Sequence, residues 1–240
     1  MPRLLVGTSG WSYPHWRGIF YPPELKASGW LHHYAGYFDT VELNASFYRM
    51  PSEKAFRSWK ATAPEGFRFA VKGHRYVTHL KKLRDVGEHL ERFFERIGLL
   101  VDALGPILFQ LPPQWNCNLE RLEGFLELLP SDLRFAIEFR NTSWLKEEIF
   151  SALEDHGVAL CIASLPHFDC PVRSTAPFVY IRLHGLRQIY AGRYREDELR
   201  WWAEQISSFL AEGCDVYAYF NNDAHGYAVE NALQLKQMLS

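Results

Sequence analysis

The sequence predicts a (β/α)8 barrel, the TIM-barrel fold of the α/β class. Three observations support this fold class. Short apolar stretches alternate with amphipathic stretches about eight times along the chain. The 240 residues are close to the ~250 residues typical of such a barrel. Because no low-complexity linker and no close repeat divides the chain, we expect one domain over residues 1–240.

The composition is that of a protein with a large buried core and little net charge. Hydrophobic residues make up 48% of the chain, and the formal net charge of −2 gives no basic field that would attract nucleic acid or membrane. The 4 cysteines show no CxxC spacing, which is typical of a reduced, cytoplasmic protein. No apolar run approaches the ~20 residues of a membrane span, and the N-terminus runs directly into a strand. We therefore expect neither a membrane segment nor a signal peptide.

Four strands are predicted in the first half of the chain, where short apolar and β-branched runs lie between turn-forming residues. They cover residues 4–8, 40–43, 67–72 and 107–110. Helices are predicted from their apolar periodicity over 29–37, 52–63, 88–102 and 119–129, with Ser52 as an N-cap. A long loop rich in glycine, proline and aromatic residues follows the first strand, and residues 73–87 are expected to form a basic loop or a broken helix. Gly105-Pro106 is expected to end the third helix.

The second half repeats this pattern with one exception. Strands are predicted over 134–138, 159–163, 178–183 and 215–220, and helices over 147–156, 197–212 and 228–239. Residues 165–177 contain no helical pattern, so the sixth crossover is expected to be irregular. A doubly wound open sheet is the alternative, but it usually carries a glycine-rich phosphate loop, and Gly7-Thr-Ser-Gly10 is not a GxGxxG motif.

Polar or charged side chains stand at the predicted carboxyl ends of seven strands. Because these ends meet at one mouth of a barrel, where barrel active sites lie, we predict a site there. Its candidate residues are Ser9, Trp11, Tyr13, Glu42, Asn44, Lys72, Gln110, Glu138, Arg140, Arg182, His184, Asn221, Asn222 and Asp223. The alternative is that these charges only neutralise one another, Glu42 with Lys72 and Glu138 with Arg140 or Arg182.

Four of these residues are candidates for catalysis. Glu42 and Glu138 would form an acid–base pair whose carboxylates the neighbouring basic residues keep ionised. His184 is the expected proton shuttle near neutral pH. Lys72 would be a Schiff-base amine only with a depressed pKa, and the abundant carboxylates argue against that role.

The remaining candidates are expected to bind a ligand. The cations Lys72, Arg140 and Arg182 outnumber the two acids, which gives a positive mouth that attracts an anion. The aromatic side chains expected to cover a ring are Trp11, Tyr13 and Trp144. The side chains expected to bind polar groups are Asn44, Gln110, Asn221, Asn222 and Asp223. The loop after the seventh strand, a common phosphate site of barrels, contains Arg187, Arg193 and Arg195. No HxH or HExxH spacing indicates a metal, and the sequence identifies no cofactor.

Several motifs extend along the whole chain. They include Gly7-Thr-Ser-Gly-Trp-Ser-Tyr13, Phe38-Asp-Thr-Val-Glu-Leu-Asn44, Gly105-Pro-Ile-Leu-Phe-Gln-Leu-Pro-Pro113, Glu138-Phe-Arg140, Arg182-Leu-His-Gly185 and Tyr219-Phe-Asn-Asn-Asp223. In these motifs and their order the chain resembles the YecE-like proteins, domain of unknown function 72. The resemblance implies a single TIM barrel and no established activity. The barrel of this family is similar to those of endonuclease IV and xylose isomerase relatives, which bind metals at the same rim, but this sequence lacks their run of histidines.

These features favour a small-molecule enzyme or ligand-binding barrel that acts on an anionic, ring-containing compound. The alternative is a nucleic-acid-binding or nucleic-acid-processing barrel resembling the endonuclease IV relatives, for which binding would depend steeply on salt. A stable barrel without chemistry is the third hypothesis. The sequence leaves open whether the protein is an enzyme.

Overall fold

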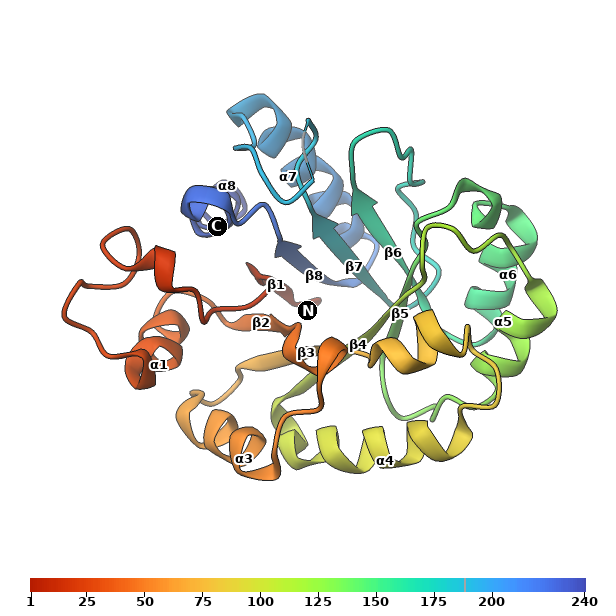
Figure 1. Cartoon of the computed structure of the whole chain (residues 1–240). Helices are drawn as coiled ribbons and strands as arrows, with labels where there is room; N and C mark the ends of the chain where they lie inside the picture. Colours follow the sequence, from red (N-terminus) through yellow and green to blue (C-terminus); the bar gives the residue numbers. More distant parts are fainter. Residues whose placement is uncertain (188) are drawn as a thin grey trace.

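Eight parallel strands form a nearly closed barrel, and helices lie around its outside (Figure 1). This computed structural model describes residues 1–187 and 189–240. The strands are β1 (Leu4–Thr8), β2 (Thr40–Leu43), β3 (Arg68–Lys72), β4 (Leu104–Gln110), β5 (Phe135–Glu138), β6 (Ala159–Ser164), β7 (Phe178–Leu183) and β8 (Asp215–Phe220). The predicted (β/α)8 fold class is therefore confirmed.

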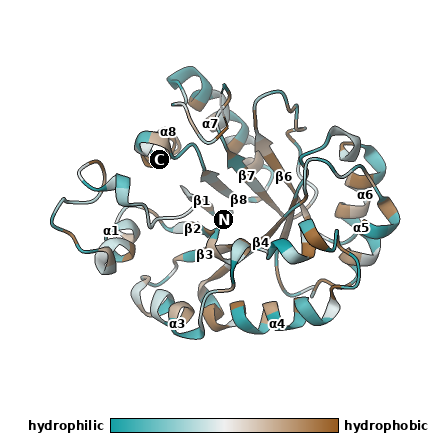
Figure 2. Cartoon of the chain, viewed as in Figure 1, coloured by the Kyte–Doolittle hydropathy of each residue, from teal (hydrophilic) through white to brown (hydrophobic). Residues whose placement is uncertain are grey.

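The surrounding helices are amphipathic, as the mixed colours along each of them show in Figure 2. In α4, for example, Leu90, Phe93 and Ile97 are buried at helical spacing. The α-helices are α1 (Trp30–Ala35), α2 (Ala45–Tyr48), α3 (Glu53–Thr62), α4 (Gly87–Ile97), α5 (Leu119–Leu126), α6 (Glu147–Asp155), α7 (Glu196–Ala211) and α8 (Tyr227–Met238). None of the described helices combines the length and the apolar character needed to cross a membrane.

Side chains fill the barrel interior, so it is a packed core and not a pore. Tyr180 of β7 and Tyr219 of β8 supply large rings, and Ala70 of β3 and Ala136 of β5 supply small side chains. Strand residues alternate between the inside and the outside, so the residue two positions further along each strand also points inward, one layer closer to the mouth. These positions hold Lys72 of β3, Gln110 of β4, Glu138 of β5 and Arg182 of β7. The strand period therefore places a polar layer above an apolar core.

The seam of the barrel lies between β1 and β2, where the side chain of Tyr34 takes the place of a strand ladder. Across the described residues, ladder pairing runs from β1 through β8 round to β2, without pairs between β2 and β1. The buried Tyr34 hydroxyl accepts a hydrogen bond from the Thr8 backbone N–H (2.9 Å) and donates one to the Thr40 carbonyl (3.1 Å). Gly7 is required at this seam, since a Cβ atom there would lie 2.3 Å from the Thr40 carbonyl oxygen.

Most predicted elements are confirmed with small shifts at their ends, but two regions differ. β4 begins at Leu104, before its predicted start, so Gly105-Pro106 lies inside a strand. The strand tolerates this proline because the β3–β4 register shifts there, between Phe69 and Val71, and the ladder is interrupted. The helix predicted over 88–102 ends at Ile97 and continues as a 3-10 helix over Gly98–Ala103.

The connections between the elements are partly irregular. No sequence signal predicts α2, a single turn after β2. A π-helix over Tyr76–Leu80 lies in the segment predicted as a loop or broken helix. Residues 165–177 contain no helix, so the irregular sixth crossover is confirmed. Short 3-10 helices cover Pro14–Trp16, Ala27–Gly29, Thr142–Trp144 and Ala224–Gly226.

Candidate functional site

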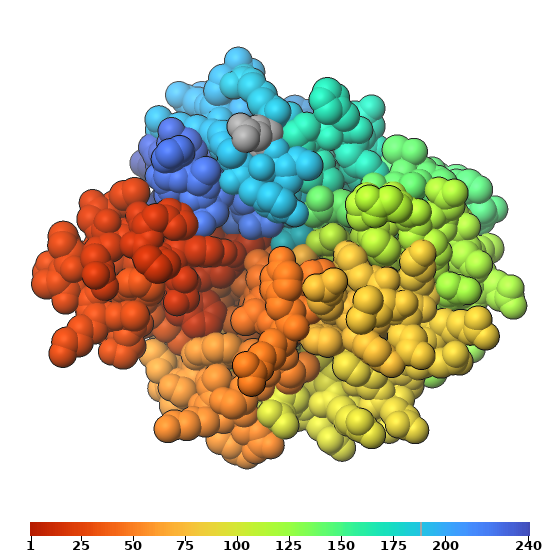
Figure 3. All heavy atoms as spheres, in the orientation of Figure 1, coloured from red at the N-terminus to blue at the C-terminus, as the bar shows by residue number. Residues whose placement is uncertain are grey.

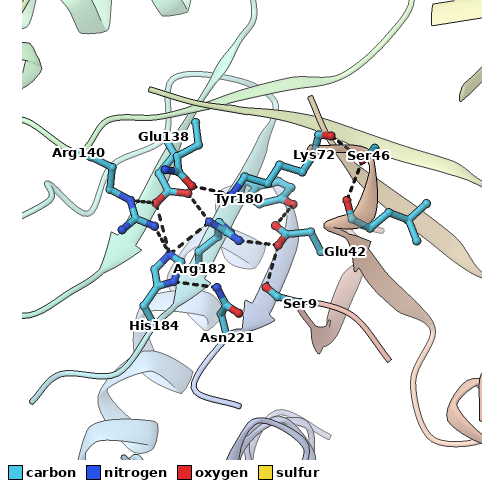
Figure 4. A network of polar contacts seen from close by, with 12 residues as sticks. Ser9, Glu42, Ser46, Lys72, Glu138, Arg140, Tyr180, Arg182, His184 and Asn221 are labelled. Atoms are coloured by element: carbon cyan, nitrogen blue, oxygen red, sulfur yellow. Dashed lines mark hydrogen bonds and ion pairs between the residues drawn. The ribbon is translucent and has the colours of Figure 1, made fainter. Parts of the chain in front are cut away.

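Arg182 binds the carboxylates of Glu42 and Glu138 at the carboxyl-terminal mouth of the barrel (Figure 4). Its Nη2 donates to Glu42 Oε1 (2.7 Å) and its Nη1 to Glu138 Oε2 (2.6 Å). Ser9 and Tyr180 also donate to Glu42, at 2.8 Å and 2.7 Å. All five side chains are buried. A buried arginine thus neutralises two buried acids, whose remaining lone pairs are largely satisfied.

Glu138 links this ion pair to Arg140, His184 and Asn221. Arg140 Nε donates to Glu138 Oε1, and Arg140 Nη2 lies 3.0 Å from His184 Nε2. The other ring nitrogen, Nδ1, lies 3.1 Å from the side-chain amide of Asn221. His184 Nε2 also lies 3.3 Å from Glu138 Oε1, so this nitrogen contacts both the arginine and the carboxylate. The Asn221 atom that faces Nδ1 is the amide nitrogen Nδ2.

Lys72, at the end of β3, has a neutral partner. Its Nζ donates to Gln110 Oε1 (2.7 Å) and lies 4.2 Å from the centre of the Phe47 ring. No carboxylate of the described residues forms an ion pair with Lys72, because arginines hold both nearby acids. Lys72 is therefore the one basic member of the predicted catalytic set whose charge is not balanced by direct contact with an acid.

The two acids are held in their ionised forms. Burial acts to raise the pKa of Glu42, but the charge and hydrogen bond of Arg182 outweigh it and lower that pKa. Burial acts in the same sense on Glu138, and the charges of Arg140 and Arg182 hold its pKa well below the usual range. Both carboxylates are thus hydrogen-bond acceptors at neutral pH, as the sequence predicts from their basic neighbours.

The pKa values of the two basic candidates are lowered, which favours their neutral forms. Burial, followed by the charge of Arg182, lowers the pKa of His184 to about 3, so the ring is neutral at pH 7. This value does not fit the predicted role of a proton shuttle near neutral pH. Burial and the same arginine lower the pKa of Lys72 to about 7. The expectation that carboxylates would keep the Lys72 pKa high is wrong, because the arginines already neutralise those carboxylates.

A cavity of about 510 Å³ adjoins this network at Glu42. Its lining includes Trp11, Tyr13, Asn44 and Trp59. Figure 3 shows a hollow between the red N-terminal segment and the orange segment that follows β2. Trp11 and Trp59 meet edge to face, with ring centres 5.3 Å apart. The buried Oδ1 atom of Asn44 has no hydrogen-bond partner among the described residues. The cavity thus combines aromatic walls with one unsatisfied acceptor.

Two aromatic candidates differ in their accessibility. Trp144 is fully buried, stacks on Phe139 and donates through its indole N–H to the Trp115 carbonyl (2.8 Å). It belongs to the buried hydrophobic core and does not cover the mouth, contrary to the prediction. Tyr13 lines the cavity, although its hydroxyl is occupied by a hydrogen bond to the Ser9 carbonyl.

Two polar candidates after β8 have structural partners of their own. Asn222 is buried and donates to the side chain of Asn231 (2.9 Å). Asp223 accepts from the Trp16 indole N–H (2.6 Å) and forms an ion pair with His15 (3.0 Å). These contacts attach the loop after β8 to the N-terminal segment and to α8. The structure therefore does not bring Asn222 and Asp223 into the network around Arg182.

The three arginines predicted as a phosphate site are exposed, and each faces a carboxylate. The partners are Glu198 for Arg187 (3.4 Å), Glu230 for Arg193 and Asp197 for Arg195 (3.0 Å). This loop does not present free cations as expected. Within residues 1–187 and 189–240, no three His, Cys, Asp or Glu side chains are grouped so that they would hold a metal ion.

Two residues at the site were not identified as candidates. Tyr180 donates to Glu42, and its position two residues before Arg182 puts both on the same face of β7. The strand period would therefore have found Tyr180. Trp59 of α3 lines the cavity only because α3 packs beside the loop after β1. No local pattern in the sequence links these two segments.

This chain is similar in sequence and structure to proteins of one family. The family model described as "Protein of unknown function DUF72" matches residues 5–240. The chain is 25% identical to UPF0759 protein YunF of Bacillus subtilis (strain 168) over 272 residues, covering 98% of this chain and 94% of that protein. A DUF72 family protein of known structure from Thermotoga maritima MSB8 is 33% identical, with a TM-score of 0.91 and 99% of each chain covered. One from Enterococcus faecalis V583 shares the fold, with a TM-score of 0.86 at 23% identity over 100% of this chain and 95% of that one.

Proposed function

This chain belongs to the DUF72 family, and we propose that its barrel mouth binds a small anionic compound that contains a ring. The proposal is supported mainly by the convergence of six ionisable side chains at one mouth (Figure 4): Glu42, Lys72, Glu138, Arg140, Arg182 and His184. Burying charges costs stability even when they are paired. Clusters of buried ionisable side chains with shifted pKa values are typical of functional sites.

Arg140 and Lys72 are the proposed contacts of the anion. Arg182, the residue that the sequence suggests for this role, is 1% exposed and has both terminal nitrogens on carboxylates. The Arg140 side chain is 10% exposed, and its Nη1 makes no hydrogen bond to the described residues. An anion that enters the mouth would therefore meet Arg140 first, while Arg182 holds the acids in place.

The ring is proposed to lie in the cavity that Trp11 and Trp59 line, which adjoins the network at Glu42. Flat aromatic walls of this kind suit stacking and edge contacts with a ring. Asn44 supports the proposal, because a buried acceptor without a partner favours a donor group on a ligand or an ordered water.

Titration calorimetry with phenyllactate and phenyl phosphate tests this proposal. We expect at least one of these ring-bearing anions to bind more tightly than lactate, phosphate or phenol, because charge and ring each contribute. Arg140→Met should weaken binding, whereas the control Arg187→Met changes an exposed arginine outside the mouth and should not. Absence of binding by both compounds, or equal binding by the Arg140→Met variant, would contradict the proposal.

Nucleic-acid binding is the competing outcome. The pairing of the loop arginines with carboxylates weakens the support for it. A single-stranded oligonucleotide titrated at low and at moderate salt separates the two functions. Tight binding that falls steeply with salt would favour a nucleic-acid-binding barrel, and weak binding at both salt concentrations would favour the small-molecule site.

A further inference from the structure

The Lys72 amine lies in an environment that suits a nucleophile better than a structural cation. Its side chain is buried, with a residue exposure of 8%. Nζ donates to the neutral amide of Gln110 at 2.7 Å, and no carboxylate of the described chain forms an ion pair with it. The acids that could have held its proton are bound to Arg140 and Arg182 instead.

These surroundings favour the neutral amine. Burial is the larger influence and the Arg182 charge the next, and together they lower the Lys72 pKa to about 7. The Phe47 ring, 4.2 Å from Nζ, attracts an ammonium group and acts in the opposite sense, but it also shields the amine from water. At pH 7 about half of the Lys72 side chains would carry a free lone pair, which a lysine needs in order to attack a carbonyl group.

Arg140 supplies a recognition group at the same mouth, and its charge acts on this amine. Figure 4 shows both side chains in one polar network, in which Arg140 contacts Glu138 and Lys72 contacts Gln110. Arg140 has one terminal nitrogen, Nη1, without a hydrogen bond to the described residues, and a guanidinium matches a carboxylate in charge and shape. We propose that Lys72 forms a Schiff base with a 2-oxo acid whose carboxylate binds Arg140. This inference rests on the proposed function and names the substrate class of the same site.

The proposed step exchanges an amine and a ketone for an imine and water. The Lys72 nitrogen attacks the carbonyl carbon, forming a C–N bond, and the carbonyl π electrons move to the oxygen. Transfer of one proton from nitrogen to oxygen gives the carbinolamine. The C–O bond then breaks, the second nitrogen proton leaves with the oxygen as water, and the C=N bond forms. The step needs no oxidant, reductant or further reactant.

Reductive trapping tests the inference on the intact protein. The protein is incubated with phenylpyruvate and sodium cyanoborohydride, and the reduced adduct is located by peptide mass mapping. We expect one adduct, on the peptide that contains Lys72, and its loss in Lys72→Met but not in the control Lys60→Met, which changes a surface lysine paired with Asp102. Because the adduct is mapped in the wild-type protein, the result does not depend on the folding of either variant. Labelling spread over surface lysines, or no labelling, would overturn the inference.

A parallel titration separates failure of the inference from failure of the proposed function. Phenyllactate carries the same ring and carboxylate as phenylpyruvate but has a hydroxyl group in place of the carbonyl group. If both bind and Arg140→Met weakens both, yet no adduct is trapped, the Schiff base is wrong and the anion site stands. If neither phenyllactate nor phenyl phosphate binds and no adduct forms, both proposals fail.

Discussion

Arg182 bridges Glu42 and Glu138, two acids from strands that are not neighbours in the barrel. Its terminal nitrogens lie 2.7 Å and 2.6 Å from the two carboxylates, and all three side chains are buried. The third guanidinium nitrogen, Nε, is buried without a hydrogen-bond partner in the described chain. The bridge therefore joins β2, β5 and β7 across the mouth, and its geometry is determined by the two acids.

Removal of this bridge should destabilise the protein strongly. Arg182→Met leaves two buried carboxylates without their shared cation, so we expect the free energy of unfolding to fall by about 3–5 kcal/mol. Urea unfolding at pH 7 measures the change. Arg187→Met is the matched control, because its side chain is exposed and lies 3.4 Å from Glu198; it should change stability by less than about 0.5 kcal/mol. Equal stability of the two variants would show that Arg182 is not a structural bridge.

The sequence predicts the charged members of this network and the pairs of Glu138 with Arg140 and Arg182. The predicted pair of Glu42 with Lys72 is wrong, because Glu42 binds Arg182 instead. Glu42, Glu138 and Arg182 stand at strand ends, and the period of two residues in a strand places them on the inner face. Which acid meets which base depends on the tilt and stagger of the strands. The sequence alone therefore leaves Lys72 and Arg182 equivalent, although one has a neutral partner and the other two acids.

The fold, too, could be predicted from the sequence only in part. The alternation of short apolar runs and amphipathic helices predicts the barrel, and the missing helical pattern predicts the irregular sixth crossover. Pro106 looks like a stop signal in the sequence, but a shift in the β3–β4 register accommodates it within β4. Trp144 looks like a rim residue because it follows a strand, yet it packs on Phe139 in the core. Both differences arise from tertiary contacts that have no local signal.

Because Lys72 loses its proton more easily in the folded state, the free energy of unfolding should change with pH in the alkaline range. Its pKa is lowered from 10.5 to about 7 in the folded state, so the unfolded chain binds the proton more tightly. Between these two values stability should rise with pH, by up to about 1.4 kcal/mol per pH unit. We expect Lys72→Met to lose this rise, and the surface variant Lys60→Met to keep it. Urea unfolding at pH 7, 8 and 9 provides the comparison, and identical slopes in all three proteins would refute the assignment.

His184 should contribute to the loss of stability in mild acid. Its pKa is lowered from 6.5 to about 3, so the unfolded state binds the proton more tightly between these values, and stability falls as the pH falls. The charged groups that face the ring are Glu138, Arg140 and Arg182. The depressed pKa values of Glu42 and Glu138 act in the same direction, but mainly below their usual value of 4.5.

Between pH 6.5 and 4.5, His184 acts together with His74, His79 and His89, whose pKa values burial also lowers, so a variant is needed to identify its share. His184→Asn should flatten the pH dependence of unfolding in this window relative to the wild type. His32→Asn, on the exposed side of α1, is the control and should leave it unchanged. A wild-type slope that persists in His184→Asn would show that other groups account for it.

Tyr34→Phe should weaken the seam of the barrel. The substitution removes the hydroxyl that joins the Thr8 N–H to the Thr40 carbonyl and leaves both buried groups without this partner. We expect the free energy of unfolding to fall by about 1–3 kcal/mol, the cost of an unsatisfied buried polar group. Tyr37→Phe removes a hydroxyl from an exposed ring one turn further along and should have little effect. Hydrogen exchange adds a local readout, because opening of the seam should accelerate exchange at the Thr8 amide more than in the centre of β6. Unchanged protection of Thr8 in Tyr34→Phe would mean that contacts other than this hydroxyl keep β1 beside β2.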